Sequence, residues 1–175
     1  MTTVVHFAYG IEMHPEEMAR IVPSARLVGR AVLADHRLEF YGHSRVWDGA
    51  EESVVPEPGS VVHGVLYRMS PRDADRLDAE RDVKLNGTGS RFHYPVEVLA
   101  EDGAIQPALM LKKDRRGAPR PPSSEYLARV VQGAELCGLP QPWVEALRGT
   151  VSVPAAYPVP QRIATLAVIG IGCDC

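Results

Sequence analysis

The four residues Tyr9-Gly10-Ile11-Glu12 place a glycine turn beside a carboxylate near the start of the chain. Backbone N–H groups in a tight glycine turn converge and can bind an anion without help from a cation. A neighbouring carboxylate can accept a proton and return it. Because the turn ends a run of strand-forming residues, we expect the ligand site of this protein at the end of its first strand.

Other residues that could do chemistry show no spacing that predicts a site. The histidines have neither an i,i+4 pair nor a zinc-protease spacing, so we expect no metal. They are His6, His14, His36, His43, His63 and His93. The three cysteines, Cys137, Cys173 and Cys175, are odd in number and irregularly spaced, which argues against a disulfide framework. The sequence predicts no cofactor.

Length and composition indicate one globular domain. The chain has 175 residues, of which 45% are apolar and 23% are charged. The net charge is -3, so the chain lacks the broad basic surface that binds nucleic acid. Because we find neither a secretion signal nor a run of about 20 apolar residues, we expect a cytoplasmic protein without a membrane span.

The first half of the chain alternates strand and turn signals. Apolar and β-branched runs predict strands at residues 3–8, 25–34, 37–40 and 60–69, with a short helix at 13–21. The polar, turn-rich stretch 42–58 predicts a long loop. Ser70-Pro71 should begin a helix that reaches about residue 79, because a hydroxyl caps free N–H groups and proline suits the first helical position.

The second half adds a hairpin and the longest helix. Strands at 91–100 and 105–112 flank an Asp102-Gly103 turn, and Asp-Gly between apolar runs is typical of a hairpin. Ser123 or Ser124 should cap a helix that ends at Gly138, and a short helix should cover 140–147. The tail reads as an arm with a strand at 162–171. This order predicts an α+β fold with a mixed or antiparallel sheet.

Several segments, taken in order, carry a recognisable pattern. They are Phe7-Ala8-Tyr9-Gly10 with Met13, Gly29-Arg30-Ala31-Val32-Leu33 with Arg37-Leu38-Glu39-Phe40, the stretch 58–67, Leu77-Asp78, Pro122-Ser123-Ser124-Glu125-Tyr126 with Gly133-Ala134, and Gly138-Leu139-Pro140. Together they resemble the gamma-glutamylcyclotransferases over residues 5–148. The resemblance implies a small mixed β-barrel with peripheral helices and a pocket at one barrel mouth. Residues 1–149 would form this domain and 150–175 a C-terminal extension.

The resemblance also implies a ring closure. In this family the free α-amine of a γ-glutamyl compound attacks its own side-chain carbonyl, which forms 5-oxoproline and expels the linked amine. The reaction needs a base for an ammonium with a pKa near 8, an acid for the leaving amine, and donors for the oxyanion. One buried carboxylate can serve as both base and acid.

The chain departs from the family at two positions. The loop usually reads Tyr-Gly-Ser-Asn, whereas here Ile11 and Glu12 follow the glycine. Glu12 would repel an anionic group of the substrate unless it is protonated or turned outward. The family's catalytic glutamate belongs to Leu-Asp-x-x-Glu, and Arg81 occupies its place. Arginine cannot act as a base at neutral pH.

Two arrangements could restore a catalytic carboxylate. A shift of one residue at the helix end could turn Glu80 into the pocket. Alternatively, Glu12 takes over as the catalytic carboxylate and Arg81 binds an anion, in which case the two should form an ion pair. Tyr9, Gly10 and Ile11 would then bind the substrate with Arg81. In a third interpretation, Glu12 and Arg81 are only solvated surface charges.

Three functional hypotheses follow. The first is an enzyme that releases an amine from a γ-glutamyl amide or a related small amide, forming 5-oxoproline. The second is a catalytically silent member that binds a small carboxylate ligand. The third is a biosynthetic enzyme with a tailored substrate. Each predicts a small-molecule partner rather than nucleic acid or a membrane, and a homodimer stays open.

Overall fold

The core of the fold is a closed barrel of five strands in the order β1-β3-β2-β4-β5. The computed structural model describes residues 2–113 and 117–161. The strands are β1 (Val4–Ala8), β2 (Arg26–Ser44), β3 (Gly49–Met69), β4 (Arg91–Ala100) and β5 (Ile105–Lys113). Neighbours are antiparallel except β1 and β5, whose parallel pairing at His6 and Leu109 closes the barrel. The predicted α+β class and mixed barrel are therefore confirmed.

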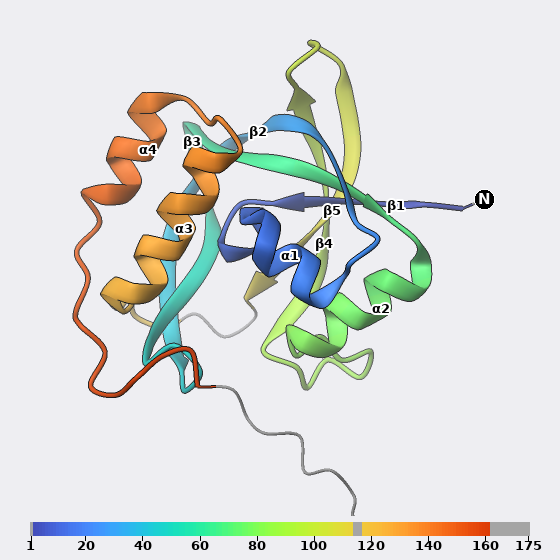
Figure 1. The fold of residues 1–175 in the computed structure, drawn as a ribbon. Helices are drawn as coiled ribbons and strands as arrows, with labels where there is room; N and C mark the ends of the chain where they lie inside the picture. Colours follow the sequence, from blue (N-terminus) through green and yellow to red (C-terminus); the bar gives the residue numbers. More distant parts are fainter. Residues whose placement is uncertain (1, 114–116, 162–175) are drawn as a thin grey trace, which may run out of the picture.

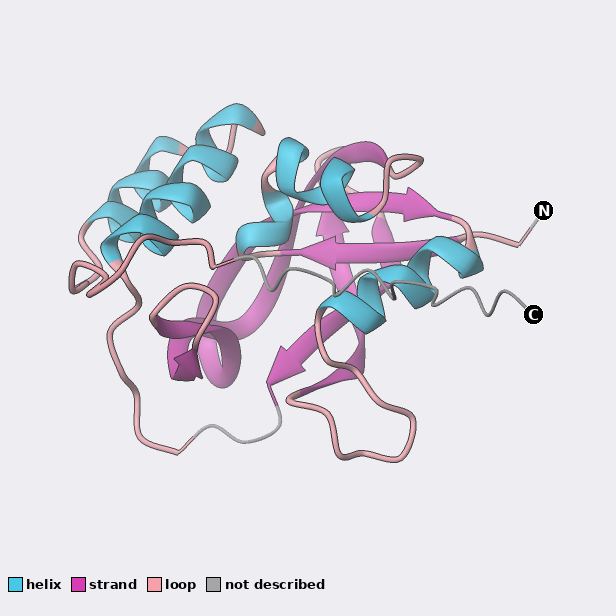
Figure 2. Ribbon diagram, turned by 60° about the horizontal axis from the view of Figure 1, so that its bottom comes forward, coloured by secondary structure: helices cyan, strands magenta, loops and turns pink. Residues whose placement is uncertain are grey.

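The helices lie outside the barrel (Figure 1, Figure 2). They are the 3-10 helix η1 (Ile11–Met13), α1 (Pro15–Ile21), α2 (Pro71–Glu80), α3 (Ser124–Leu136) and α4 (Gln141–Arg148). As predicted, the Ser70 hydroxyl caps α2 by accepting from the Asp73 N–H, and the Ser123 hydroxyl caps α3 by accepting from the Tyr126 N–H. These caps fix where each helix begins, and therefore which side chains face the barrel. No helix in the described ranges is long and apolar enough to cross a bilayer.

Two hairpins build most of the barrel. The β4–β5 hairpin is confirmed, with Gly103 in the left-handed region at φ 84°. The predicted loop at 42–58 is wrong, because β2 and β3 continue through it and turn only at residues 45–48. Glycines, prolines and acidic residues are typical of loops, so the composition of this stretch did not indicate the strands that it forms. Its prolines take strand positions, and Pro56 pairs with His36 next to a β-bulge.

Strand β1 separates two layers of the core. The side chains of Phe7 and Tyr9 pack with the cluster inside the barrel, whereas Ala8 packs with the cluster beneath the helices. His6 alternates with Phe7 along the strand and therefore faces the helical side, like Ala8. The loop after β1 thus lies where the barrel mouth meets the helices.

The described part of the C-terminal arm folds back onto the barrel. The backbone of Val153 accepts from Ser124 N at 3.0 Å, and the Tyr157 hydroxyl donates to the Arg45 carbonyl at 2.7 Å. The strand predicted at 162–171 and the terminal Cys173 and Cys175 lie outside the described residues.

The close approach of β1 to β3 gives a test of the fold. A Cβ added at Gly64 would collide with the Ala8 carbonyl oxygen and come within 2.8 Å of the Phe7 ring. We expect Gly64→Ala to destabilise the protein by about 1–3 kcal/mol, because the Ala8 carbonyl belongs to the paired backbone of β1 and cannot move without disturbing the sheet. Urea unfolding measures the change. Gly149→Ala is the control, since its Cβ would lie 3.5 Å from the nearest atom. Equal stability of the two variants would contradict the proposed packing.

Candidate functional site

The loop after β1 turns its side chains inward. The Tyr9 hydroxyl donates to the Leu111 carbonyl at 2.6 Å inside the barrel. Gly10 follows, and Ile11 is buried in the core beneath the helices. Glu12 is only 4% exposed, so it is not a solvated surface charge. Of these four predicted residues, Gly10 and Glu12 therefore border a buried polar site, whereas Ile11 serves packing.

Glu12 forms a buried ion pair with Arg81. The Arg81 Nε lies 2.8 Å from Glu12 Oε1, and the His6 Nε2 lies 2.8 Å from Glu12 Oε2. Arg81 is the C-terminal capping residue of α2, and its side chain is 10% exposed. The ion pair predicted from the two complementary replacements is thus present. It joins the loop after β1 to the end of α2.

Arg81 also decides the charge state of Glu12. Burial by itself would raise the pKa of the Glu12 carboxyl, but the attraction of Arg81 and the hydrogen bond from His6 outweigh it. The pKa of Glu12 falls to about 2, from an ordinary value of 4.5. Glu12 is therefore a stable anion at neutral pH and a weak base.

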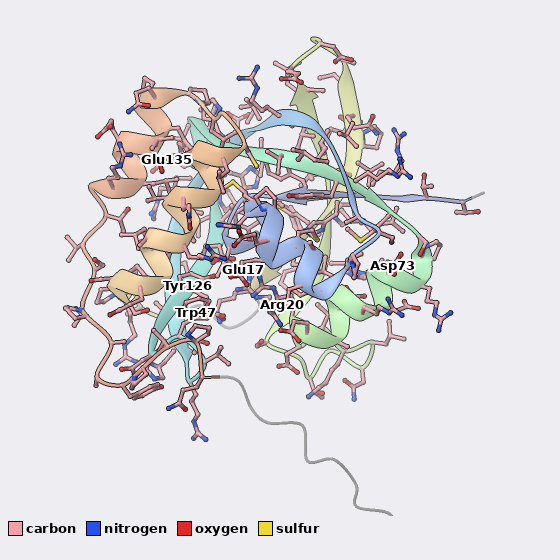
Figure 3. All side chains as sticks on the ribbon, viewed as in Figure 1. Glu17, Arg20, Trp47, Asp73, Tyr126 and Glu135 are labelled. Atoms are coloured by element: carbon pink, nitrogen blue, oxygen red, sulfur yellow. The ribbon has the colours of Figure 1, made fainter. Side chains whose placement is uncertain are left out.

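Glu80 does not reach this site. Its carboxylate accepts from Arg20 Nη2 at 2.8 Å, and both side chains are more than 40% exposed. Arg20 lies on α1, facing α2 (Figure 3). Successive residues of a helix point about 100° apart, so the end of α2 directs Arg81 inward and Glu80 to the surface.

The structure adds a carboxylate that the sequence did not indicate. Glu52 on β3 is 2% exposed, and its carboxylate accepts a hydrogen bond from the Tyr126 hydroxyl of α3. Trp47, from the turn between β2 and β3, packs edge-on against the Tyr126 ring at 5.2 Å (Figure 3). The Glu52 side chain lies directly over Gly10, where an added Cβ would collide with it. A side chain at position 10 would therefore force the Glu52 carboxylate to move from its place beside Tyr126.

The pKa of the Glu52 carboxyl is shifted upward, whereas the pKa of the Glu12 carboxyl is shifted downward. Loss of water raises the pKa of the Glu52 carboxyl above 4.5, and the attraction of Arg91 only partly offsets this. Glu52 therefore holds a proton more readily than an ordinary glutamate. Two carboxylates whose environments push their pKa values apart are a common feature of acid–base sites.

A second set of charges continues from Glu52. The Arg91 Nη2 lies 3.5 Å from Glu52 Oε1 and 3.4 Å from Glu51 Oε2. Lys113 Nζ donates to Glu51 at 3.1 Å. Arg91 and Lys113 lower the pKa of Glu51, although its burial opposes them. Strands β3, β4 and β5 thus each contribute a charge to the site.

The buried site leaves hydrogen-bonding capacity unused. Among the described residues, Glu12 Oε1, Arg81 Nε and Arg91 Nη2 are buried without a hydrogen-bond partner. The first two are close, but the Arg81 N–H does not point at the oxygen within hydrogen-bond limits. Native proteins rarely leave such atoms without a partner, so these three atoms are positions where a ligand can donate or accept a hydrogen bond. A ligand with both an ammonium and a carboxylate would satisfy them. No group of three or more metal-ligating side chains occurs in 2–113 or 117–161.

The pKa of Glu12 predicts how stability depends on pH. Because the folded pKa of about 2 lies below the ordinary 4.5, ionised Glu12 stabilises the fold fully above pH 4.5. This stability is lost as the pH falls toward 2, by an amount on the order of 2–3 kcal/mol. Glu12→Gln should therefore make stability less sensitive to pH between 6 and 3. Urea unfolding at several pH values measures this.

The surface variant Glu80→Gln serves as the control for this experiment. It removes one carboxylate from an exposed ion pair and should keep the pH dependence of the wild type. If Glu12→Gln also kept the wild-type pH dependence, Glu12 would not be the strongly paired anion described above.

Comparison with known proteins places the chain in a family. Residues 61–147 match the model of the AIG2-like family. The chain is 30% identical to the gamma-glutamylcyclotransferases of Mus musculus, over 83% of this chain and 78% of that protein, and of Homo sapiens, over 82% and 77%. A solved structure named gamma-glutamyl cyclotransferase superimposes with a TM-score of 0.84 at 26% identity and covers 90% of this chain and 94% of its own. The chain belongs to the gamma-glutamylcyclotransferase family.

Proposed function

We propose that this protein converts a γ-glutamyl amide, or a related small amide, into 5-oxoproline and a free amine, with Glu52 carrying the protons. One observation carries the proposal. A buried carboxyl with a raised pKa lies directly over Gly10, in the loop where the family binds its substrate. The activity is supported by family membership, and the assignment to Glu52 rests on this geometry.

Glu52 suits the proton transfers better than the two glutamates proposed from the sequence. Glu80 is exposed and paired with Arg20. Glu12 is held as an anion with a pKa of about 2, so it would accept a proton only in strong acid. The raised pKa of Glu52 lies closer to that of the substrate ammonium, near 8, which makes transfer between them easier.

Glu12 and the arginines would orient the substrate. The unsatisfied Glu12 oxygen can accept from the substrate ammonium, and the unsatisfied nitrogen of Arg81 can donate to its α-carboxylate. The Tyr9 hydroxyl is already bonded to the Leu111 carbonyl, so Tyr9 would contact the substrate without a hydrogen bond from its side chain, and Gly10 would contact it through its backbone. Arg91 Nη2 remains for the oxygen of the carbonyl under attack, where a buried guanidinium stabilises the developing negative charge.

The reaction then balances around one carboxyl group. Ionised Glu52 takes a proton from the α-ammonium, and the free amine forms a C–N bond to the side-chain carbonyl carbon. Glu52 gives its proton to the leaving nitrogen as the old C–N bond breaks. Two protons in total move from the attacking to the leaving nitrogen, one at a time, so Glu52 ends ionised as it began. The Tyr126 hydroxyl holds the carboxylate in place.

A silent, ligand-binding protein is the second candidate. One observation favours it: Arg81, at the position where the resemblance places the family's glutamate, is committed to an ion pair with Glu12. A silent member would bind a γ-glutamyl compound through the same cluster and release no 5-oxoproline. A biosynthetic enzyme with a tailored substrate would release 5-oxoproline from only one class of amide.

A panel of γ-glutamyl amines, γ-glutamyl dipeptides and glutathione tests the proposal by measuring 5-oxoproline. We expect turnover by the wild type and a loss of at least 100-fold in Glu52→Gln, because the amide cannot accept a proton. Glu80→Gln is the matched control and should keep wild-type activity. Turnover that survives Glu52→Gln would contradict the assignment.

A binding measurement separates loss of chemistry from loss of folding. Calorimetry with 5-oxoproline should give similar affinity for Glu52→Gln and the wild type, since the substitution keeps the shape of the side chain. Binding without turnover of any panel member by the wild type would support the silent, ligand-binding function instead.

A further inference from the structure

We propose that a second cavity, between α2 and the outer face of β1 and β5, binds a small primary amine with an apolar body. The cavity has a volume of about 170 Å³. Its floor is formed by Val4 and His6 of β1 with Leu109 and Leu111 of β5, and its roof by α2. It lies on the helical side of β1, separated by His6 from Glu12 and Arg81.

The size of the cavity limits the occupant. An apolar cavity of about 150 Å³ in a protein core is large enough to hold benzene. This cavity is slightly larger, at about 170 Å³, and is lined mainly by aliphatic side chains. It therefore fits roughly six to eight non-hydrogen atoms. A dipeptide is too large, and a single water would leave the aliphatic walls without contacts.

The charges at the cavity select the class of ligand. Asp75 and Asp78 line it from α2, three residues apart and therefore on the same face of the helix. Asp75 has no ion-pair partner among the described residues. Asp78 accepts from His93 Nε2 at 2.8 Å, and a carboxylate has further lone pairs for a second donor. The two carboxylates attract a cation and repel a carboxylate ligand. Two histidines also line the cavity, and each already has a carboxylate partner, His6 with Glu12 and His93 with Asp78.

A primary ammonium meets both requirements. Its N–H groups can reach Asp78 and Asp75 at the rim, while its alkyl or aryl body fills the space against Leu77, Leu109 and Leu111. A metal ion is excluded as the occupant by the donor set, because no group of three or more ligating side chains converges in the described residues. His6 lines the cavity and also forms a hydrogen bond with Glu12. The cavity is thus separate from the Gly10 loop but touches the same histidine.

Titration of the isotopically labelled full chain with benzylamine, followed by amide NMR shifts, tests the proposal. Benzylamine has an aromatic body and one ammonium. We expect the shifts to be confined to the elements that line the cavity, namely α2, β1, β5, the end of β3 and the start of β4 around His93. Benzyl alcohol, which has the same shape without the charge, should bind at least tenfold more weakly. Absence of shifts in α2 at millimolar benzylamine would overturn the proposal, and so would equal binding of the alcohol.

Two variants and a control assign the site. Ala74→Leu fills the cavity and should abolish binding, and Asp78→Asn should weaken it at least fivefold. Asp102→Asn removes an equivalent carboxylate from the exposed β4–β5 turn and should change nothing. If Ala74→Leu does not fold, the test rests on Asp78→Asn alone. Binding of benzylamine by Asp78→Asn at wild-type strength would contradict the proposed site. These outcomes do not depend on turnover, so they are independent of the ring-closing reaction.

Discussion

Charged side chains can leave water only if they find partners, and this constraint shapes the whole site. The chain buries four charged residues where the barrel meets the helices, namely Glu12, Glu52, Arg91 and Lys113, and it covers most of Glu51 and Arg81 beside them. Removing one partner of a buried pair typically costs 3–5 kcal/mol, because the other charge is left uncompensated. Glu12 and Arg81 therefore depend on each other, because removing either would leave the other charge without its partner.

The same cluster gives its carboxyl groups different properties. Arg81 and His6 hold Glu12 as an anion, whereas burial keeps the pKa of Glu52 high. The fold provides this separation by bringing the pieces from distant parts of the sequence. The long β2–β3 hairpin carries Glu52 over Gly10, the capped α3 supplies Tyr126, and the end of α2 supplies Arg81. In the proposed reaction, Glu12 acts as the fixed anion and Glu52 as the proton carrier.

Local chemistry in the sequence was enough to predict several elements. Ser70-Pro71 and Ser123 cap their helices where expected, and Asp102-Gly103 turns the predicted hairpin. The Glu12–Arg81 pair could be predicted because the two departures from the family are complementary in charge. The caps and the hairpin turn follow from rules about neighbouring residues. The ion pair follows from the family resemblance, which placed both residues around one site.

The sequence did not indicate Glu52 as a site residue. A strand is recognised in a sequence by its buried apolar residues, and this part of β3 buries a charged residue instead. Gly49-Ala50 before it and Val54-Val55 after it form the apolar frame of a strand, but the acids and prolines between and beyond them resemble a loop. Glu80 illustrates a different limit. Whether Glu80 or Arg81 points inward depends on helical phase at the last residue, which a sequence pattern does not resolve.

The most direct test of the account is the titration of the two glutamates. Carbon-13 NMR of the side-chain carboxyl groups follows each one with pH, and Glu52→Gln and Glu12→Gln assign the signals. The account predicts that Glu52 titrates above 4.5 and that Glu12 stays ionised to a pH near 2. A Glu52 that titrates at or below 4.5 would contradict its role as the proton carrier.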